Sequence, residues 1–563
     1  MRIPRQRTVT EAPPAPPQPR AEPPARPSRW WIYALVIAGL LGQMAFAMVT
    51  AARQQSPIVD EPVYVSTSLV YLQDHSLEYN FEHPPLAKLI MATGLASADA
   101  RMPPPEFEGS QWQLGEQVLY QQGNDAQELL FLARLPMIIL TLLFGLVVFS
   151  FARDLAGPLA GLAALGLYAF SPDVIAHGSL ATLDMPAAGF LLTALWLLWR
   201  ARTRPYRYLP LAGIALGAAL ATKMSTLPAL PLAALLAVLS MRHARIGRRL
   251  AAGAGVVVIA IATTWVTYLL VDPGLRWTTP ADLPVVHGLT GTLIDWLPLP
   301  EPFRDGARLQ FGFEDMAFPG FLLGEAYTGS KWYYLPVALL IKEPLGMLVL
   351  WIAGATAMVV VPRLRIAAVY VLAPTAVLLL VAMGGSRDWG VRYAIFVPVI
   401  LAVAAGCVLA FRQRWTHIVA LLLVLSVAVS SVRTFPYYLP YSNEAFGGPG
   451  KTYLRLADSN VDWGQDLARL GDRLAEKYPG QPVWMAYKGR GNPGYYGIRA
   501  KHPLTVPEDQ VRGIIAVSTN CLRVPFCIPV KAGIDPGPRQ LDELLDSSRL
   551  VGHVGHSILI YRR

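Results

Sequence analysis

A series of long apolar runs is the feature that most constrains what this chain can fold into. A helix that crosses the hydrocarbon core of a bilayer needs roughly 17–25 mostly apolar residues. Such runs recur along the chain up to residue 433, and no internal repeat accompanies them. We predict spans at 31–51, 129–151, 158–177, 181–199, 208–222, 227–241, 250–271, 332–361, 366–383, 391–410 and 415–433.

Composition agrees with this reading. Hydrophobic residues make up 53% of the chain, only 15% of its residues are charged, and its mean hydropathy is +0.38. Soluble domains carry about 25% charged residues. The sequence therefore predicts a polytopic α-helical membrane protein with about eleven spans in a bacterial inner membrane, with the lipid bilayer as one of its partners.

The net charge of +10 follows a topological pattern. Cytoplasmic loops of membrane proteins are enriched in Lys and Arg. With the Pro- and Arg-rich tail 1–29 read as disordered and cytoplasmic, alternate loops carry the arginines, and a nucleic-acid partner loses its support. These arginines are Arg153, Arg200, Arg202, Arg204, Arg207, Arg242, Arg245, Arg248, Arg249, Arg363, Arg365, Arg412 and Arg414.

The outward segments differ in kind. Loops 52–128 and 272–331 are long and polar, and they belong to a membrane domain that we place at 30–433. Because eleven spans reverse the side of the chain, 434–563 is predicted outside, in the periplasm. Its alternating apolar runs (PVWMAY, GIIAVS, SILIYR) and helical stretches predict a small α/β domain. Cys521 and Cys527 could form a disulfide there.

Carboxylates near the outer ends of spans are candidate catalytic groups, because ionisable residues at membrane depth are costly. Asp60 and Glu61 follow the first span, where a solvated loop pair is the alternative interpretation. Asp184, in ATLDMP, begins an unbroken apolar helix and is the stronger case. Asp173 and His177 are interpreted as helix-end residues.

Cations gather on the same outward side. FEHPPLAKLI at 81–90 carries His83 and Lys88 on a segment expected along the membrane surface. Lys342 interrupts an apolar run in which 332–341 is a surface or re-entrant helix, with a snorkelling lysine as the alternative. Arg392 precedes a span, where guanidinium suits a grip on phosphate, and Lys223 lies in another outward turn.

Outer carboxylates beside outer cations suit the transfer of a group from a lipid phosphate. A carboxylate takes the proton of an acceptor hydroxyl as the hydroxyl attacks the sugar. The phosphate leaves as a stable anion, and fixed cations stabilise its charge. Because nucleotide sugars stay in the cytosol, an outward-facing enzyme is expected to use a polyprenyl-phosphate-linked sugar donor.

At these residues the sequence resembles the family that joins protein O-mannosyltransferases to the lipid A aminoarabinose transferases, the family 39-like glycosyltransferases of the GT-C fold. The resemblance covers roughly residues 31–410. It rests on ordered motifs: Asp60-Glu61, FEHPPLAKL, ARLP at 133–136, ATLDMP at 181–186, ATK at 221–223, KEP and VRY.

The resemblance implies a role for most of these residues. Asp60 is then the expected base, with Asp184 and Glu61 as further catalytic carboxylates. Lysines and arginines are expected to hold the donor phosphate. The resulting substrate-binding set is His83, Lys88, Arg134, Lys223, Lys342, Arg392 and Tyr393.

The chain departs from the aminoarabinose transferases at His83, where those enzymes have lysine. The first loop has no DxD-type pair, so no metal is predicted. Downstream, YLPYSNEAFGGPG and LADSNVDWGQDL are similar to segments of bacterial relatives.

Two other classes of membrane protein are alternatives. A transporter or flippase of lipid-linked sugars needs charges along a path to the cytoplasmic side, whereas here they concentrate outside. A polysaccharide polymerase or ligase would share the donor but lacks the Asp-Glu pair after the first span. The acceptor stays open among protein hydroxyls, lipid A and a cell-surface glycan.

Overall fold

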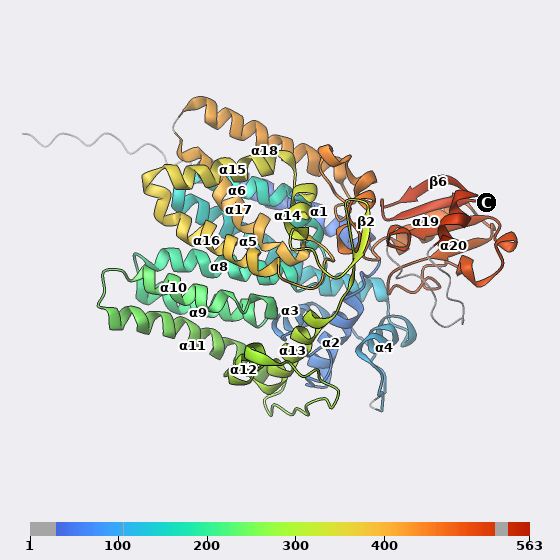
Figure 1. Cartoon of the computed structure of the whole chain (residues 1–563), viewed down its shortest axis with the longest axis horizontal. Coiled ribbons are helices and arrows are strands. Elements are labelled where there is room, and N and C mark those ends of the chain that lie inside the picture. Colours follow the sequence, from blue (N-terminus) through green and yellow to red (C-terminus); the bar gives the residue numbers. More distant parts are fainter. Residues whose placement is uncertain (1–29, 105, 412, 524–538) are drawn as a thin grey trace, which may run out of the picture.

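The computed structural model describes residues 30–104, 106–411, 413–523 and 539–563. A bundle of long helices occupies one end of the molecule and a small sheet domain the other (Figure 1). The predicted tail 1–29 and Cys527 lie outside the described residues, so the proposed bridge between Cys521 and Cys527 stays a prediction.

The bundle is built from thirteen named helices within the described ranges. They are α1 (Trp30–Gln54), α5 (Ala126–Ala156), α6 (Pro158–Phe170), α7 (Pro172–Gly178), α8 (Asp184–Ala201), α9 (Pro205–Leu220), α10 (Ala229–Ser240), α11 (Ile246–Val271), α14 (Tyr334–Lys342), α15 (Leu345–Val360), α16 (Arg365–Ala382), α17 (Phe396–Gly406) and α18 (Arg414–Thr434). One continuous apolar core runs through them.

Fewer helices reach full span length than the sequence predicts. Among the described residues, five helices are long and apolar enough to cross a membrane, and seven if each bent pair counts as one span. Four of the eleven predicted spans fall instead on α8, α9, α10 and α17. α10 has 12 residues and rises about 18 Å, well short of a core about 30 Å thick. α8 has 18 residues, but the charged residues Asp184 and Arg200 near its two ends make it less apolar than a typical span.

Two predicted spans are broken helix pairs. α6 and α7 meet at 63° around Ser171 and Pro172, and α14 and α15 meet at 117° around Glu343 and Pro344. Proline lacks the N–H that would continue each helix. The second break agrees with the surface or re-entrant helix predicted for 332–341.

The two long loops fold against each other beside the bundle (Figure 1). The first contains α2 (Glu61–Gln73), α3 (Leu86–Leu95) and α4 (Gln111–Glu116), and the second contains α12 (Gly288–Trp296), α13 (Glu301–Gly312) and the hairpin β1 (Pro319–Leu322) to β2 (Glu325–Thr328). The Phe81 and Trp277 rings meet at 5.2 Å, and Gln310 donates to the Glu82 carbonyl at 3.3 Å. The second loop therefore packs on the FEHPPLAK motif.

The C-terminal α/β domain is confirmed. Its five strands lie in the order β4-β3-β5-β7-β6, with β3 parallel to β4 and β5, and β7 antiparallel to β5 and β6. The predicted apolar runs become β3 (Val483–Ala486), β5 (Ile514–Ser518) and β7 (Ile558–Arg562); β4 (Ala500–Lys501) and β6 (Arg549–Val554) complete the sheet. The predicted helices are α19 (Leu467–Lys477) and α20 (Arg539–Asp546).

An amphipathic helix joins the domain core. α19 buries Leu467, Leu470 and Leu474, which share one helix face, in the apolar cluster of the sheet.

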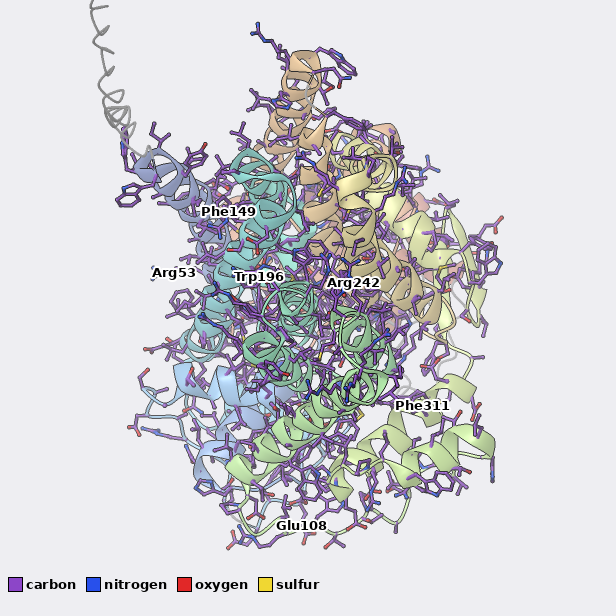
Figure 2. The ribbon with its side chains drawn as sticks, turned by 90° about the vertical axis from the view of Figure 1, so that its left-hand side faces the viewer. Arg53, Glu108, Phe149, Trp196, Arg242 and Phe311 are labelled. Carbon is purple, nitrogen blue, oxygen red and sulfur yellow. The ribbon has the colours of Figure 1, made fainter. Side chains whose placement is uncertain are left out.

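Arginine-rich turns lie at the end of the bundle away from this domain. Figure 1 places the α10–α11 turn there, and Figure 2 looks onto that end, with Arg242 labelled. The arginine-rich turns and the sheet domain therefore lie at opposite ends of the bundle, as the charge pattern predicts. The compartment that each faces stays a prediction.

Candidate active site

Two carboxylate–cation pairs form the centre of the site, and the first joins Asp60 to Arg392. Asp60 precedes α2, and Arg392 lies in the short helix Val391–Ala394 at the start of a predicted span. Arg392 Nη1 donates to Asp60 Oδ2 at 2.7 Å. Their side chains keep 11% and 19% of their surface exposed, so a substrate can reach both.

The second pair joins Asp184 to Lys223. Asp184 is the first residue of α8, and Lys223 follows α9, so the ends of two antiparallel helices bring them together. The Lys223 ammonium donates to the Asp184 carboxylate. Asp184 is nearly buried, whereas Lys223 keeps 13% of its side chain exposed.

Tyr393 connects the two pairs. Lys223 Nζ lies 5.2 Å from the centre of its ring, and the Arg392 guanidinium carbon lies 5.1 Å from the same centre. An aromatic ring attracts cations through its negative face. One cluster therefore unites residues from four predicted motifs. Its members are Asp60, Asp184, Lys223, Arg392 and Tyr393.

The FEHPPLAK loop borders this cluster through His83. Its ring lies edge-on to Tyr64 at 6.1 Å. Burial, followed by the charges of Lys88, Lys223 and Arg387, holds the pKa of His83 well below its usual range. At neutral pH a neutral imidazole therefore lies within electrostatic range of Lys223 and Asp184.

Lys88 is fully buried and braces that loop from inside. Its ammonium donates to the backbone oxygens of Asn80 and His83 at 2.7 and 2.8 Å, and to the Asn80 side chain at 3.0 Å. Burial lowers the pKa of Lys88 to about 7. The predicted phosphate contact is thus not available to Lys88 in this structure, because its donors hold the loop.

Glu61 and Arg134 are paired away from any open surface. Arg134 donates to both Glu61 oxygens at 2.6 and 2.7 Å and to the carbonyls of Ala52, Gln55 and Ser56. Both side chains are 0% exposed. In this structure the two residues fix the turn that carries Asp60, and their predicted roles in catalysis and substrate binding stay predictions.

Lys342 is likewise buried rather than exposed at phosphate depth. It pairs with Asp173 at 3.0 Å and donates to the carbonyls of Leu439 and Asn460 at 2.6 and 3.0 Å. Its side chain is 0% exposed. In this structure Lys342 ties the α14–α15 bend to the chain that follows α18, and its predicted phosphate contact stays a prediction.

Sequence reasoning missed the residues that the C-terminal region adds. The Trp463 ring lies 4.3 Å from the Arg392 guanidinium, and Lys488 pairs with Asp458 nearby. His177, expected as a helix-end residue, is buried with its ring 6.1 Å from Trp463. The ordered motif DSNVDWGQD was the available signal. Within the described residues, no group of three His, Cys, Asp or Glu side chains is arranged to hold a metal.

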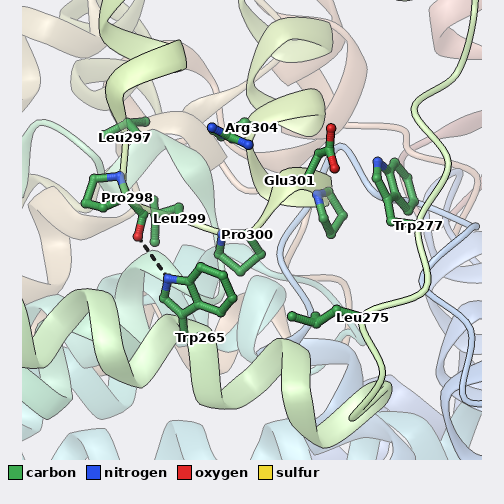
Figure 3. Close-up of a pocket in the computed structure, with 10 residues that line it drawn as sticks. Trp265, Leu275, Trp277, Leu297, Pro298, Leu299, Pro300, Glu301 and Arg304 are labelled. Carbon is green, nitrogen blue, oxygen red and sulfur yellow. Dashed lines mark hydrogen bonds between the residues drawn. The ribbon is translucent and has the colours of Figure 1, made fainter.

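An apolar pocket of about 650 Å³ adjoins the second loop (Figure 3). It is lined by Trp265, Leu275, Trp277, Leu297, Pro298, Leu299, Pro300, Glu301, Pro302 and Arg304. Trp265 closes one side by donating to the Pro298 carbonyl at 2.8 Å. Trp277, which lines the pocket, also packs on Phe81 of the FEHPPLAK loop.

Comparison with protein families finds a match over part of the chain. Residues 126–268 match the model of the dolichyl-phosphate-mannose-protein mannosyltransferases. This segment is about a quarter of the chain and contains Asp184 and Lys223. The match confirms the family resemblance predicted from the ordered motifs. The part of the chain that holds Asp184 and Lys223 is thus similar to membrane-bound mannosyltransferases that use a lipid-phosphate sugar.

The solved structures that resemble this chain are distant in sequence. ArnT from Cupriavidus metallidurans bound to undecaprenyl phosphate is 15% identical over 95% of this chain and 98% of its own, with a TM-score of 0.48. The Pmt1-Pmt2 complex of S. cerevisiae bound to the sugar donor is 18% identical over 43% and 33%, with a TM-score of 0.34. AglB from Archaeoglobus fulgidus, in complex with an inhibitory peptide and a dolichol-phosphate, is 12% identical over 88% and 72%, at 0.41. A search of curated protein sequences finds no significant match.

Proposed function

We propose that this enzyme transfers a sugar from a polyprenyl-phosphate donor to an acceptor hydroxyl on the periplasmic face of a bacterial inner membrane. The observation that carries the proposal is the cluster of two carboxylates and two cations around Tyr393. The matched family is named after a sugar linked to a lipid phosphate and after a protein acceptor. That name supports a lipid-phosphate-linked sugar as the donor.

Asp60 is the proposed base. It accepts the proton of the acceptor hydroxyl while that oxygen attacks the anomeric carbon of the sugar. The bond between the anomeric carbon and the phosphate oxygen breaks, and the electron pair leaves with the polyprenyl phosphate. Because the phosphate is stable as an anion, the reaction needs no general acid.

Arg392 and Lys223 are the proposed phosphate ligands. Each now neutralises a carboxylate, and each keeps part of its side chain exposed. A donor phosphate would compete for both cations and draw charge away from Asp60 and Asp184. Donor binding would thereby free the base for the acceptor proton, and the same cations would stabilise the leaving phosphate.

The apolar pocket suits the lipid part of the donor. Its wall consists mainly of tryptophan, leucine and proline side chains at the end of the α11 span. An isoprenoid chain seated there would place its phosphate towards the FEHPPLAK loop, where His83 lies within electrostatic range of the charged cluster. A protein hydroxyl, lipid A and a cell-surface glycan remain the acceptor classes to be distinguished.

A deletion strain complemented with wild type or with Asp60→Asn tests the proposal. Mass spectrometry of envelope glycoproteins and glycolipids should find a sugar that depends on the wild-type gene and is missing with Asp60→Asn. Immunoblotting of membranes controls for the amount of each protein. Equal glycosylation in both complemented strains would refute the role of this site.

A further inference from the structure

The segment 458–467, here called the junction segment, links the charged cluster to the C-terminal domain. On one side it holds the chain next to Asp60. The Ser56 N–H donates to the Gln465 carbonyl at 3.0 Å, and the Ser56 hydroxyl donates to the Gly464 carbonyl at 2.9 Å. The N–H of Val59, the residue before Asp60, donates to the Trp463 carbonyl at 2.9 Å.

On its other side the junction segment holds the chain next to Arg392. The Val391 N–H donates to Asn460 Oδ1 at 3.0 Å, and the Ser459 N–H donates to the Trp389 carbonyl at 3.2 Å. Gly390 makes this approach possible. Its φ is +145°, and a Cβ there would lie 2.1 Å from Ser459 Oγ.

The sheet domain fixes the junction segment in turn. The Asp458 N–H donates to Asn520 Oδ1 at 2.7 Å, and Asn520 Nδ2 donates to the Asp462 carbonyl at 2.5 Å. Ser518, at the end of β5, donates to the Asp462 carboxylate. The position of the segment therefore depends on the folded C-terminal domain.

Trp463 is the residue of this segment that reaches the ion pair. The residue is 3% exposed, and its ring lies 4.3 Å from the Arg392 guanidinium. Its backbone carbonyl binds the residue before Asp60. Trp463 thus contacts Arg392 through its ring and the residue next to Asp60 through its backbone carbonyl.

We infer that Trp463 is a positioning residue, supplied from outside the membrane domain, that orients Arg392 for the donor phosphate and aligns it with Asp60. The inference rests on the proposed function. A guanidinium attracted to an aromatic face is held in place without using its N–H groups, which stay available to a carboxylate or a phosphate. In this way the C-terminal domain completes the active site of the membrane domain.

The first measurement tests the contact without reference to the reaction. A double-mutant cycle in purified protein compares the melting temperatures of wild type, Trp463→Leu, Arg392→Met and the double variant. Residues in contact give non-additive effects, whereas independent residues add. Non-additive shifts are expected here. Additive shifts would overturn the inference.

The second measurement tests positioning with undecaprenyl phosphate as the probe. Trp463→Leu should weaken its binding about tenfold, the equivalent of roughly 1.4 kcal/mol and within the range of a desolvated cation–π contact. Trp463→Phe keeps an aromatic face and should recover most of that loss. Trp484→Leu is the matched control, because Trp484 lies in β3 and donates to the Arg512 carbonyl; it should bind the probe as wild type does.

The outcomes separate the two proposals. If Trp463→Phe and Trp463→Leu bind equally weakly, or if Trp484→Leu matches them, Trp463 only packs the junction and the inference is wrong. If wild type fails to bind undecaprenyl phosphate, the proposed function fails, and the double-mutant cycle alone decides whether Trp463 holds Arg392.

Discussion

Two kinds of ion pair lie at the same end of the bundle, and the other contacts of each cation distinguish them. Arg134 and Lys342 are fully buried and also bind backbone carbonyls. Arg392 and Lys223 keep exposed surface and lie against aromatic rings. Cations bound to carbonyls are committed to the fold. Cations held by a carboxylate and a ring can exchange that partner for a phosphate.

The adjacent residues Asp60 and Glu61 give the sharpest test of this comparison. Asp60→Asn should lower transfer activity by at least about a hundredfold, within the range expected for loss of a general base, and leave the melting temperature unchanged. Glu61→Gln should lower the melting temperature, because Arg134 loses its charged partner. Transfer assays and thermal unfolding of both variants in the same detergent make the measurement. If Glu61→Gln is stable and inactive while Asp60→Asn is active, the assignment is reversed.

The arginines should divide in the same way. Arg134→Met leaves Glu61 buried without a cation and should destabilise the fold by about 3–5 kcal/mol. Arg392→Met leaves Asp60 partly exposed to water, so its main effect should be on donor binding. Expression level and thermal unfolding report the first loss, and undecaprenyl phosphate binding reports the second. Similar melting temperatures for the two variants would remove the distinction between committed and exchangeable cations.

Sequence patterns predicted which residue types gather at the site better than what each one does there. Asp60, Asp184, Lys223 and Arg392 all stand in ordered motifs beside spans, and the structure brings them together. Lys342 stands in an equally suggestive motif, but its ammonium binds Asp173 and two backbone carbonyls. Backbone carbonyls have no signature in a sequence, so the two cases looked alike.

The same limit explains why the sequence predicts too many full-length spans and why it does not point to Trp463. Apolar composition marks a helix as buried in the bundle or in lipid, but it does not set length: α10 is apolar and too short to span. The strands and helices of the C-terminal domain followed their periodicity closely. That Trp463 reaches Arg392 depends on a long-range docking contact, which local periodicity does not encode.

Asp462 extends the comparison to a carboxylate held by hydrogen bonds. The Ser518 hydroxyl and the Gly464 N–H donate to it, yet burial raises its pKa to about 7 from an ordinary value of 3.8. Between these values the folded protein retains a proton that the unfolded chain has released. Stability contributed by this group is therefore present at low pH and falls as pH rises through that window.

Thermal unfolding between pH 5 and 7 checks this sign. The melting temperature of wild type should fall by about a few degrees more than that of Asp462→Asn, because the variant has no charge to bury. Staying below pH 7 keeps the deprotonation of Lys88 largely outside the window. Parallel curves for the two proteins would show that Asp462 is already ionised in the fold.

The smallest expected effect concerns the pocket in Figure 3. A substitution there tests recognition of the lipid chain of the donor separately from the charged cluster. Trp277 lines this pocket, and its ring packs on Phe81 beside His83. If the pocket holds the isoprenoid chain, Trp277→Leu should raise KM for a long-chain donor several-fold and leave kcat nearly unchanged, because uniform binding is lost while the reacting groups stay in place. A donor with a chain too short to reach the pocket should show no such change. Because Trp277 also donates to Asp305 at 2.8 Å, Asp305→Asn serves as a control for loop disruption. A lower kcat with both donors, shared by the control, would mean that Trp277 supports the loop and that the chain lies elsewhere.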